Sequence, residues 1–398
     1  PLVSSSAASD VYKRQGVPFE IVPGISSSVA APAYAGIPVT HRDYCSSYTV
    51  ITGHERPEKD GESSINWKQL AESDGTKVIL MGVERIRGIA ERFMENGLNS
   101  GTPVGMVRWG TTGRQKTLIG ELGTIADLVE KNDFKSPAVT IVGGVVDLRR
   151  QLNWFERRPL FGRRVVVTRT RTQTSALGAR LSELGADVLE IPTIKIVEPD
   201  NLEALRDGLL GLGSYQWLVF TSPNGVDRFF DYFFKGFDDL RDLGGCRIAA
   251  VGPATAAKLK GLHIKIDLMP DCYTAEGVAA AFRDSEEYSV ENENVALLRA
   301  QVANPELPRE LESLGAIVDD VPVYKTVQET EDRNGAVARL QEEGADWITF
   351  TSSSTVEHFD ARFGLVETLG KHGARVISIG PETTKSLKKL GVEPAVEA

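Results

Sequence analysis

Trp217-Leu-Val-Phe-Thr-Ser222 and Trp347-Ile-Thr-Phe-Thr-Ser352 are two versions of one string, 130 residues apart. Leu181-Ser-Glu-Leu-Gly-Ala186 and Leu311-Glu-Ser-Leu-Gly-Ala316 repeat at the same spacing. A period of this length exceeds that of a solenoid unit, about 20 to 50 residues, and has the size of a whole domain. We therefore expect the back of the chain to form two similar α/β domains, with a large ligand bound between them.

Strands and helices alternate in each copy. In the first copy, an apolar run over 162–169 predicts a buried strand, and it precedes an amphipathic helix over 174–184 and a second strand over 186–192. This βαβ order is typical of a parallel sheet. Further along, the turn Thr221-Ser-Pro-Asn-Gly225 leads into a predicted helix over 226–234.

The composition limits the possible classes of protein. A chain of 398 residues suggests two or three domains, and no apolar run is long enough to cross a membrane. The net charge of −10 provides no general basic surface for nucleic acid, so we expect neither a nucleic-acid nor a membrane partner. The cysteines Cys45, Cys246 and Cys272 are far apart and lack metal-ligand spacing, which predicts a cytoplasmic protein with no metal site and no disulfides.

The first fifteen residues differ from the rest of the chain. Residues 1–15 begin without Met, contain the small polar run Ser4-Ser-Ser-Ala-Ala-Ser9, and lack the apolar core of a signal peptide. We interpret them as a non-native leader joined to a chain that has lost its true start.

Strand-to-helix junctions in both copies carry Ser, Thr and Gly. The free N–H groups of a helix N-terminus at the carboxyl edge of a sheet suit carboxylates, and ligands collect at that edge. Each junction alone could be a simple helix cap. Arg169 and Arg299 end equivalent strands, and with the junctions in two facing copies they favour a site for a polyanion.

Residues 16–156 carry a different set of strings. They are Val22-Pro-Gly-Ile-Ser-Ser27, Gly36-Ile-Pro-Val-Thr-His-Arg-Asp-Tyr44, Thr52-Gly-His54, Leu80-Met-Gly82, Gly110-Thr-Thr112, Ser136-Pro-Ala-Val-Thr-Ile-Val-Gly143 and Leu152-Asn-Trp-Phe155. As a set they resemble the second half of the uroporphyrinogen-III C-methyltransferases, members of the tetrapyrrole methylase family. That family binds S-adenosyl-L-methionine between two α/β domains, and the intact enzymes form precorrin-2.

The resemblance implies roles for several residues of this region. Ser26 and Ser27 would contact the cofactor, Met81 would pack near its adenosine, and Ala138 would meet the adenine. His41 and Arg42 would lie on the substrate side. The alternatives are a helix cap for Ser26, a core position for Met81 and a loop position for His41. The resemblance also suggests that the methyltransferase part is homodimeric.

One departure from that family matters for activity. Its glycine-rich loop and first domain have no counterpart in this sequence. Because a cleft with one wall cannot enclose a cofactor, we predict that this truncated domain does not methylate by itself.

The duplicated region carries a second set of strings. They are Val165-Val-Val-Thr-Arg169, Phe220-Thr-Ser-Pro-Asn-Gly-Val226, Ala250-Val-Gly-Pro-Ala-Thr255, Tyr273-Thr-Ala-Glu-Gly277, Val323-Tyr-Lys-Thr326, Phe350-Thr-Ser-Ser-Ser354 and Ile379-Gly-Pro-Glu-Thr383. They resemble uroporphyrinogen-III synthase over residues 162–398. The resemblance implies two flavodoxin-like parallel-sheet domains joined by a two-strand linker. One subdomain would comprise 162–196 and 327–398, and the other 199–323.

The implied reaction closes hydroxymethylbilane, a linear tetrapyrrole with eight carboxylates, into uroporphyrinogen III with inversion of the last ring and loss of water. It needs no cofactor. Tyr324 would donate the proton to the departing hydroxyl. The carboxylates would be held largely by backbone N–H groups at Thr221, Ser222, Asn224, Thr255, Thr274, Thr351, Ser352, Ser353, Gly380 and Thr383, with Arg169 and Arg299 as further candidates.

Two other interpretations remain open from the sequence. Two facing α/β domains also describe a non-catalytic binding protein or sensor for small anions. Alternatively, the synthase is active and residues 16–156 serve only as a dimerisation relic.

Overall fold

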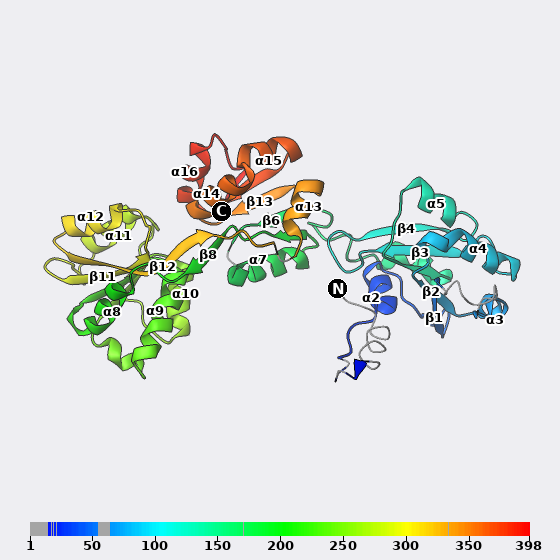
Figure 1. The fold of residues 1–398 in the computed structure, drawn as a ribbon, viewed down its shortest axis with the longest axis horizontal. Coiled ribbons are helices and arrows are strands. Elements are labelled where there is room, and N and C mark those ends of the chain that lie inside the picture. The colour runs from blue at the N-terminus through cyan, green and yellow to red at the C-terminus, as the bar shows by residue number, and fades with distance from the viewer. Residues whose placement is uncertain are drawn as a thin grey trace. The chain divides into compact units, whose positions relative to one another are not determined.

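The computed structural model describes residues 15, 16, 18, 20, 22–54, 64–169, 171–332 and 334–398, without the side chains of 171–175. The leader expected at residues 1–15 therefore lies, except for residue 15, outside the described residues. The chain divides into two compact units, residues 1–165 with 176–189, and residues 166–175 with 190–398. Each unit is described below by itself (Figure 1).

The front of the first unit is built on a mixed five-stranded sheet of order β1-β2-β5-β3-β4. β1 and β2 are parallel, whereas β5 is antiparallel to both β2 and β3, and β3 is antiparallel to β4. The strands are β1 (Tyr48–Thr52), β2 (Thr76–Leu80), β3 (Pro103–Arg108), β4 (Lys116–Glu121) and β5 (Ala138–Val142). The helices of this region are α2 (Ser27–Tyr34), α3 (Trp67–Glu72), α4 (Ile86–Glu95), α5 (Ile125–Lys131) and α6 (Arg149–Leu152).

Helices bury both faces of this sheet. On one face Ile79 and Met106 pack into a core with Phe93 of α4 and residues of α5. On the other face Val78 and Ile141 pack with residues of α2. Successive residues of a strand point to opposite faces, so Val78 and Ile79 supply one side chain to each core. The cores hold the strand ends in fixed positions for a site at the sheet edge.

The duplicated region contains two further sheets with matching strand orders. One sheet has the order β10-β9-β11-β12-β8, and the other β15-β14-β13-β6-β7. The repeat partners β10/β14, β9/β13, β11/β6 and β12/β7 follow one another in the same order, with β8 added beyond β12 in one sheet and β15 beyond β14 in the other. The strands are β6 (Arg164–Val167), β7 (Asp187–Glu190), β8 (Ile194–Val197), β9 (Trp217–Phe220), β10 (Arg247–Ala250), β11 (Asn294–Ala300), β12 (Ile317–Gln328), β13 (Trp347–Phe350), β14 (Arg375–Ser378) and β15 (Val396–Glu397).

This strand order is that of a flavodoxin-like fold. In chain order β6, β7, β13, β14 and β15 form a sheet of order 2-1-3-4-5, which places a topological switch point between β6 and β13. The equivalent switch point of the other sheet lies between β11 and β9, which pair in parallel. The predicted α/β class with parallel sheets is therefore confirmed for the duplicated region.

β8 and the end of β12 form an antiparallel pair. The pairing runs from Lys325 opposite Val197 to Gln328 opposite Ile194. Figure 1 shows the two strands side by side. This ladder corresponds to the two-strand linker expected in the duplicated region.

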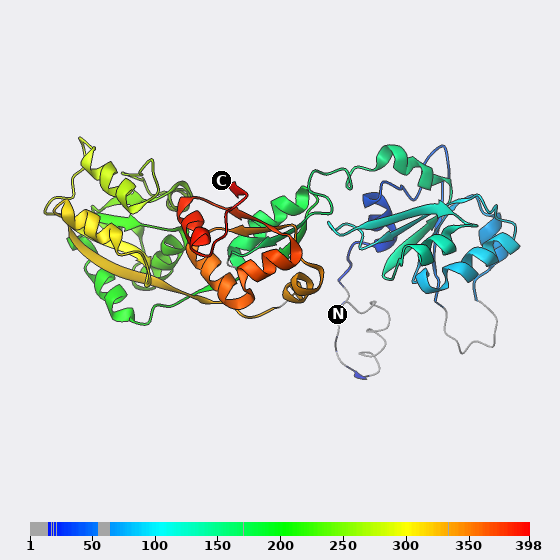
Figure 2. The same ribbon diagram turned by 90° about the horizontal axis from the view of Figure 1, so that it is seen from above.

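Helices cover both faces of the β8–β12 sheet as well. Phe220 faces a core formed with α9, whereas its neighbour Val219 faces a second core with α11 and α12. The helices of the duplicated region, which Figure 2 shows from above, are α7 (Arg171–Glu183), α8 (Leu202–Leu210), α9 (Pro223–Gly236), α10 (Pro253–Gly261), α11 (Ala275–Arg283), α12 (Glu306–Ser313), α13 (Ala336–Glu343), α14 (Ser353–Phe363), α15 (Leu365–His372) and α16 (Pro381–Lys389).

α9 shows why these helices form where they do. Ser222 caps the helix, and Pro223 at the first position has no N–H to leave unpaired. Phe229, Phe230 and Phe233 recur at helical spacing on one face and are at most 4% exposed. The packed phenylalanines fix α9 against the sheet, so its N-terminus stays at the end of β9.

Candidate functional site

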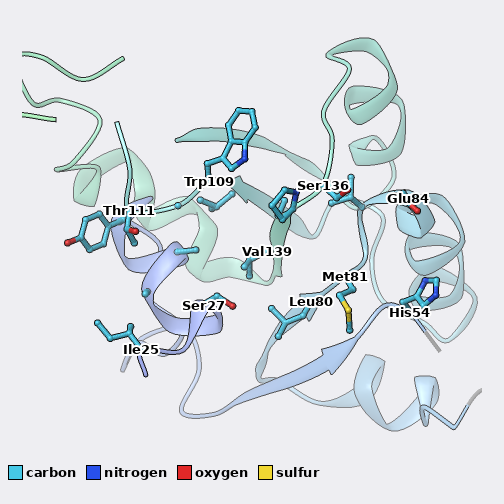
Figure 3. Close-up of a pocket in the computed structure, with 18 residues that line it drawn as sticks. Ile25, Ser27, His54, Leu80, Met81, Glu84, Trp109, Thr111, Ser136 and Val139 are labelled. Atoms are coloured by element: carbon cyan, nitrogen blue, oxygen red, sulfur yellow. The ribbon is translucent and has the colours of Figure 1, made fainter. Parts of the chain in front are cut away.

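A cavity of about 990 Å³ lies in the first unit at the ends of β2, β3 and β5. Figure 3 shows Ser27 of α2 on one side of the hollow and Met81, just after β2, on another. Ala138 at the start of β5 also lines it. Three of the four residues predicted to contact the cofactor therefore line one cavity. The fourth, Ser26, does not line it.

Three residues of this cavity have a left-handed backbone. Met81, Trp109 and Thr111 have φ of +56°, +49° and +72°. Such angles are uncommon outside glycine and concentrate at ligand sites. Met81 is 67% exposed, so the core alternative for it is wrong.

The other predicted residues of this unit lie elsewhere. Ser26 is the N-cap residue of α2, as the alternative for it held, although its hydroxyl makes no capping hydrogen bond and lies 2.9 Å from that of Ser28. Nδ1 of His41 accepts a hydrogen bond from the backbone of Asp43, and Arg42 is exposed. Neither His41 nor Arg42 lines the cavity.

The residues of the cavity fit an adenosine-containing cofactor. Its volume is within the range of small-molecule sites, about 300–1,000 Å³. The apolar atoms of Leu80, Val107 and Val139 suit a purine, and Ser27 and Thr111 supply polar groups. Part of the lining is uncovered, because Ile25 is 91% exposed.

A second candidate site lies at the carboxyl ends of β9 and β11, where Tyr324 of β12 pairs with the last residue of β11. The ring of Tyr324 belongs to the core under α9, and the residue is 7% exposed. Its hydroxyl oxygen is 3.0 Å from Oγ of Ser222. Burial raises the pKa of Tyr324, and the hydrogen bond with Ser222 opposes that rise. The phenol is therefore protonated at neutral pH and can act as a hydrogen-bond donor.

A cavity of about 230 Å³ adjoins this position. Thr221, Thr274 and Arg299 line it, and so do Glu276, Glu306 and Glu382. The three glutamates repel anions, so the part that suits a carboxylate is the side formed by Thr221, Thr274 and Arg299.

The N-termini of three helices bear the remaining predicted residues of this half. Asn224 lies in the first turn of α9, and Thr274 caps α11 by accepting a hydrogen bond from Gly277 N. Thr255 lies in the first turn of α10 and is 3% exposed. A buried side chain cannot reach a ligand in solvent, so Thr255 could contribute only its backbone N–H.

The two predicted arginines differ in their surroundings. Arg299 is 5% exposed, and its guanidinium forms two hydrogen bonds with Asp320 and one with the backbone oxygen of Asn304. Its charge is therefore already paired within the protein. Arg169 follows β6, and burial lowers its pKa.

In the other copy, the backbone N–H groups expected to bind carboxylates at Thr351 and Ser352 already have a partner within the protein. This partner is Thr355, which was not among the predicted site residues. Oγ1 of Thr355 accepts from the backbone N–H groups of Thr351 and Ser352. Oγ of Ser352 accepts from Thr355 N in return, which completes a capping box. Oγ of Ser353 donates to the backbone oxygen of Glu382. The signal for Thr355 was available, because a hydroxyl three residues after an N-cap serine can close such a box.

The last predicted pair belongs to α16. Gly380 is the N-cap residue of this helix, and Thr383 lies in its first turn and is 3% exposed. In both copies, therefore, helix N-termini follow the strand ends as predicted, but part of their hydrogen-bonding capacity is used within the protein.

Comparison with known proteins identifies both regions. Residues 175–398 match the family described as uroporphyrinogen-III synthase HemD, and residues 1–126 match the tetrapyrrole (corrin/porphyrin) methylases. A porphyrin biosynthesis protein HemD of Ruminiclostridium josui is 34% identical over 97% of this chain and 75% of its own length.

Individual methyltransferases match part of the chain. A uroporphyrinogen-III C-methyltransferase of Bacillus subtilis is 35% identical over 66% of this chain and 53% of its own length. An S-adenosyl-L-methionine-dependent uroporphyrinogen III methyltransferase of Methanosarcina barkeri is 48% identical over 35% of this chain and 54% of its own length. The chain thus spans about half the length of these two relatives.

Among solved structures, a mutant uroporphyrinogen III synthase of Thermus thermophilus is 19% identical, with a TM-score of 0.45 over 59% of this chain and 92% of its own. None of the helices in the described part of the chain has the length and apolarity needed to cross a membrane. The synthase family matches more than half of the sequence, and the Ruminiclostridium josui protein matches nearly all of it. This chain therefore belongs to the uroporphyrinogen-III synthase HemD family and carries, ahead of the synthase domain, a region of the tetrapyrrole methylase family.

Proposed function

We propose that residues 162–398 convert hydroxymethylbilane into uroporphyrinogen III, with inversion of the last ring and release of water. The observation that carries this proposal is the hydroxyl of Tyr324, which lies 3.0 Å from Ser222 at the N-terminus of α9. A protonated phenol is thereby held beside helix N-termini that suit carboxylates. A general acid and an anion-binding edge are the two elements that the reaction requires.

Tyr324 donates its proton to the hydroxyl that leaves as water. Backbone N–H groups at the helix N-termini hold the substrate carboxylates, at Thr221, Asn224, Thr255, Thr274, Ser353, Gly380 and Thr383. Four candidates remain: Thr351, Ser352, Arg169 and Arg299. Thr355 competes with the substrate for the N–H groups of Thr351 and Ser352, and Asp320 competes for Arg299. Many weak contacts of this kind orient a flexible substrate, so removal of any one side chain has a small effect.

The main task of the enzyme is conformational. Closure without an enzyme gives the isomer whose last ring is not inverted. The enzyme binds the transition state that leads to the inverted ring more strongly than it binds the ground state of the substrate. This difference favours attack by the ring carbon that gives inversion. A rigid arrangement of helix ends supports such discrimination because it does not adapt to the competing geometry.

We infer the division of the synthase from its sheets. The subdomains are 162–196 with 327–398, and 199–323, and the chain passes between them along β8 and the end of β12. The antiparallel pairing of these two segments supports this division.

We also infer that Ser26, Ser27, Met81 and Ala138 contact S-adenosyl-L-methionine in the intact methyltransferase, where this cofactor would supply the methyl group. The left-handed backbone of Met81 and the shared cavity support three of these assignments. Because Ile25 and Met81 are largely uncovered, residues 16–156 alone hold the cofactor weakly and do not methylate. Tight binding of S-adenosyl-L-methionine to the chain in a calorimetric titration would disprove this.

Two further expectations belong to this proposal. All three cysteines are free, which supports a location in the reducing cytoplasm. If the methyltransferase part is homodimeric, sedimentation of the chain gives twice the mass of one copy.

The experiment that separates an enzyme from a binding protein is a turnover measurement. The chain is mixed with a hundredfold excess of hydroxymethylbilane, and consumption is followed against the spontaneous rate. An enzyme consumes the whole excess faster than buffer does. A non-catalytic binding protein sequesters at most one equivalent and leaves the rest to react at the spontaneous rate.

A further inference from the structure

The hydroxyl of Ser222 joins the start of α9 to the phenol of Tyr324. Oγ of Ser222 accepts a hydrogen bond from the N–H of Gly225 at 3.0 Å, which fixes one of its two lone pairs. Oγ also lies 3.0 Å from the hydroxyl oxygen of Tyr324. Ser222 therefore keeps its own proton and one lone pair for contact with the phenol.

Tyr324 itself is held from several sides. Its ring lies in the core that includes Phe220 and Phe229, and its backbone oxygen accepts a hydrogen bond from Gln301 N at 2.8 Å. Among the described residues, the bond with Ser222 is the hydrogen bond that the phenol forms. The remaining freedom of Tyr324 is rotation of its hydroxyl, which contacts Ser222.

The internal repeat contains a natural comparison. Ile191-Pro-Thr-Ile-Lys195 and Val321-Pro-Val-Tyr-Lys325 lie 130 residues apart, so Ile194 occupies the position of Tyr324 in the other copy. Both residues are 7% exposed.

The serine of the N-cap accepts the same capping hydrogen bond in both copies, from Gly225 N in one and from Thr355 N in the other, but its second contact differs. Ser352 is equivalent to Ser222, yet its hydroxyl contacts Ser354 and the backbone of Thr355. A serine at this position is thus sufficient as a cap, and the contact with a phenol is specific to the copy that contains Tyr324.

Charged groups near Tyr324 are paired with other residues. Lys325 forms an ion pair with Asp200, and Arg299 forms one with Asp320. Negative charge that develops on the phenol oxygen must therefore be stabilised by Ser222 and by the positive end of α9.

We propose that Ser222 is a positioning residue for Tyr324, in place of the carboxylate-binding role expected from the sequence. Ser222 donates its proton to the phenol oxygen, which leaves the phenol proton directed at the departing hydroxyl. As the carbon–oxygen bond of the substrate breaks, that proton passes to the hydroxyl and water leaves. The substituted carbon of the last ring then forms a new carbon–carbon bond, which gives a spiro intermediate. The older bond from that carbon to its bridge carbon breaks, and the bridge carbon bonds to the free carbon of the same ring. The free carbon loses its own proton, which returns to the phenolate. This role rests on the synthase function proposed above.

The test compares Ser222→Ala with Ser222→Thr in the full chain. We expect Ser222→Ala to lower kcat at least tenfold while KM stays within twofold, and Ser222→Thr to recover most of the rate. In Tyr324→Phe, the added Ser222→Ala change should cost less than twofold, because the group it positions is already gone. Increased KM with unchanged kcat in Ser222→Ala would overturn the proposal in favour of substrate binding.

Asn201→Ala is the matched control for helix capping. Oδ1 of Asn201 accepts from Glu203 N at the start of α8 in the same sheet layer, and Asn201 has no contact with the phenol. We expect a stability loss similar to that of Ser222→Ala, with kcat unchanged. A tenfold loss of kcat in both variants would show that capping, rather than contact with Tyr324, carries the effect.

A measurement without turnover separates this inference from the synthase assignment. With ¹³Cζ-tyrosine in the protein, the resonance of Tyr324 is identified by its loss in Tyr324→Phe. At neutral pH this resonance should move in Ser222→Ala and not in Asn201→Ala. An unmoved resonance would refute the contact. A moved resonance in a chain that makes no uroporphyrinogen III would refute the function while leaving the contact intact.

Discussion

Replacing Tyr324 with phenylalanine removes one oxygen from a residue that is 7% exposed and leaves the ring in its core. The fold should lose about 1 kcal/mol, the typical net value of one hydrogen bond. Oγ of Ser222 keeps its bond from Gly225 N, and because Ser222 is only partly buried, its own O–H can turn to solvent. The loss of stability is therefore small, and the variant remains folded at 25 °C.

The effect on rate should be much larger than the effect on stability. Burial raises the pKa of the phenol, so the wild-type group is fully protonated at neutral pH and available as an acid. General acids contribute roughly 10²–10⁴ in rate, or about 2.7–5.5 kcal/mol of barrier.

The assay is the rate of uroporphyrinogen III formation in a single turnover, beside the free energy of unfolding in urea. A rate loss greater than tenfold, about 1.4 kcal/mol, supports the assignment. An unchanged rate in a variant that unfolds at nearly the wild-type urea concentration would show that Tyr324 is not the proton donor.

Three further predictions concern the folded state. A Cβ at Gly277 would lie 2.0 Å from the backbone oxygen of Cys272. Gly277→Ala should therefore lower the free energy of unfolding, measured in urea, by more than about 1 kcal/mol. An unchanged free energy of unfolding would contradict the close approach. Asp320→Ala leaves the guanidinium of Arg299 buried without its carboxylate and should cost about 2 kcal/mol, whereas a cost below about 0.5 kcal/mol would show that the pair is unimportant. Burial acts to raise the pKa of Glu156, but hydrogen bonds to the carboxylate outweigh it and the pKa is lowered. The first unit should therefore lose stability as the pH falls below about 4.3, the unfolded value for glutamate, through the lower folded pKa. Glu156→Gln should make the stability of the first unit less dependent on pH in this acid range. A dependence as steep as that of wild type would show that Glu156 is not its cause.

The fold of the duplicated region could be predicted because the relevant signals are local. Strand β9 is a run of four apolar residues, and the repeat of that run after 130 residues implies a second copy of the domain. Helix ends are local too. α4 (Ile86–Glu95) ends at Asn96, and Gly97 beyond it has φ of +97°, as is common after a helix. The predicted helix over 226–234 was too short, because Pro223 opens α9 three residues earlier.

The site was less predictable because its contacts depend on sheet register. Asp320 reaches Arg299 only because β11 and β12 pair in the observed register, and 21 residues separate the two in sequence. Likewise, the backbone strain at Met81 depends on how the chain leaves β2, which a residue pattern does not specify. The contact of Tyr324 with Ser222 has the same origin, since α9 and β12 meet only in the folded domain.

The most direct test of the central claim is the isomer composition of the product. The full chain is incubated with hydroxymethylbilane, the product is oxidised, and uroporphyrins I and III are separated by chromatography. We expect mainly isomer III, formed faster than spontaneous closure, with a shift toward isomer I in Tyr324→Phe. Isomer I alone, formed at the spontaneous rate by the wild-type chain, would contradict the assignment of synthase activity to this chain.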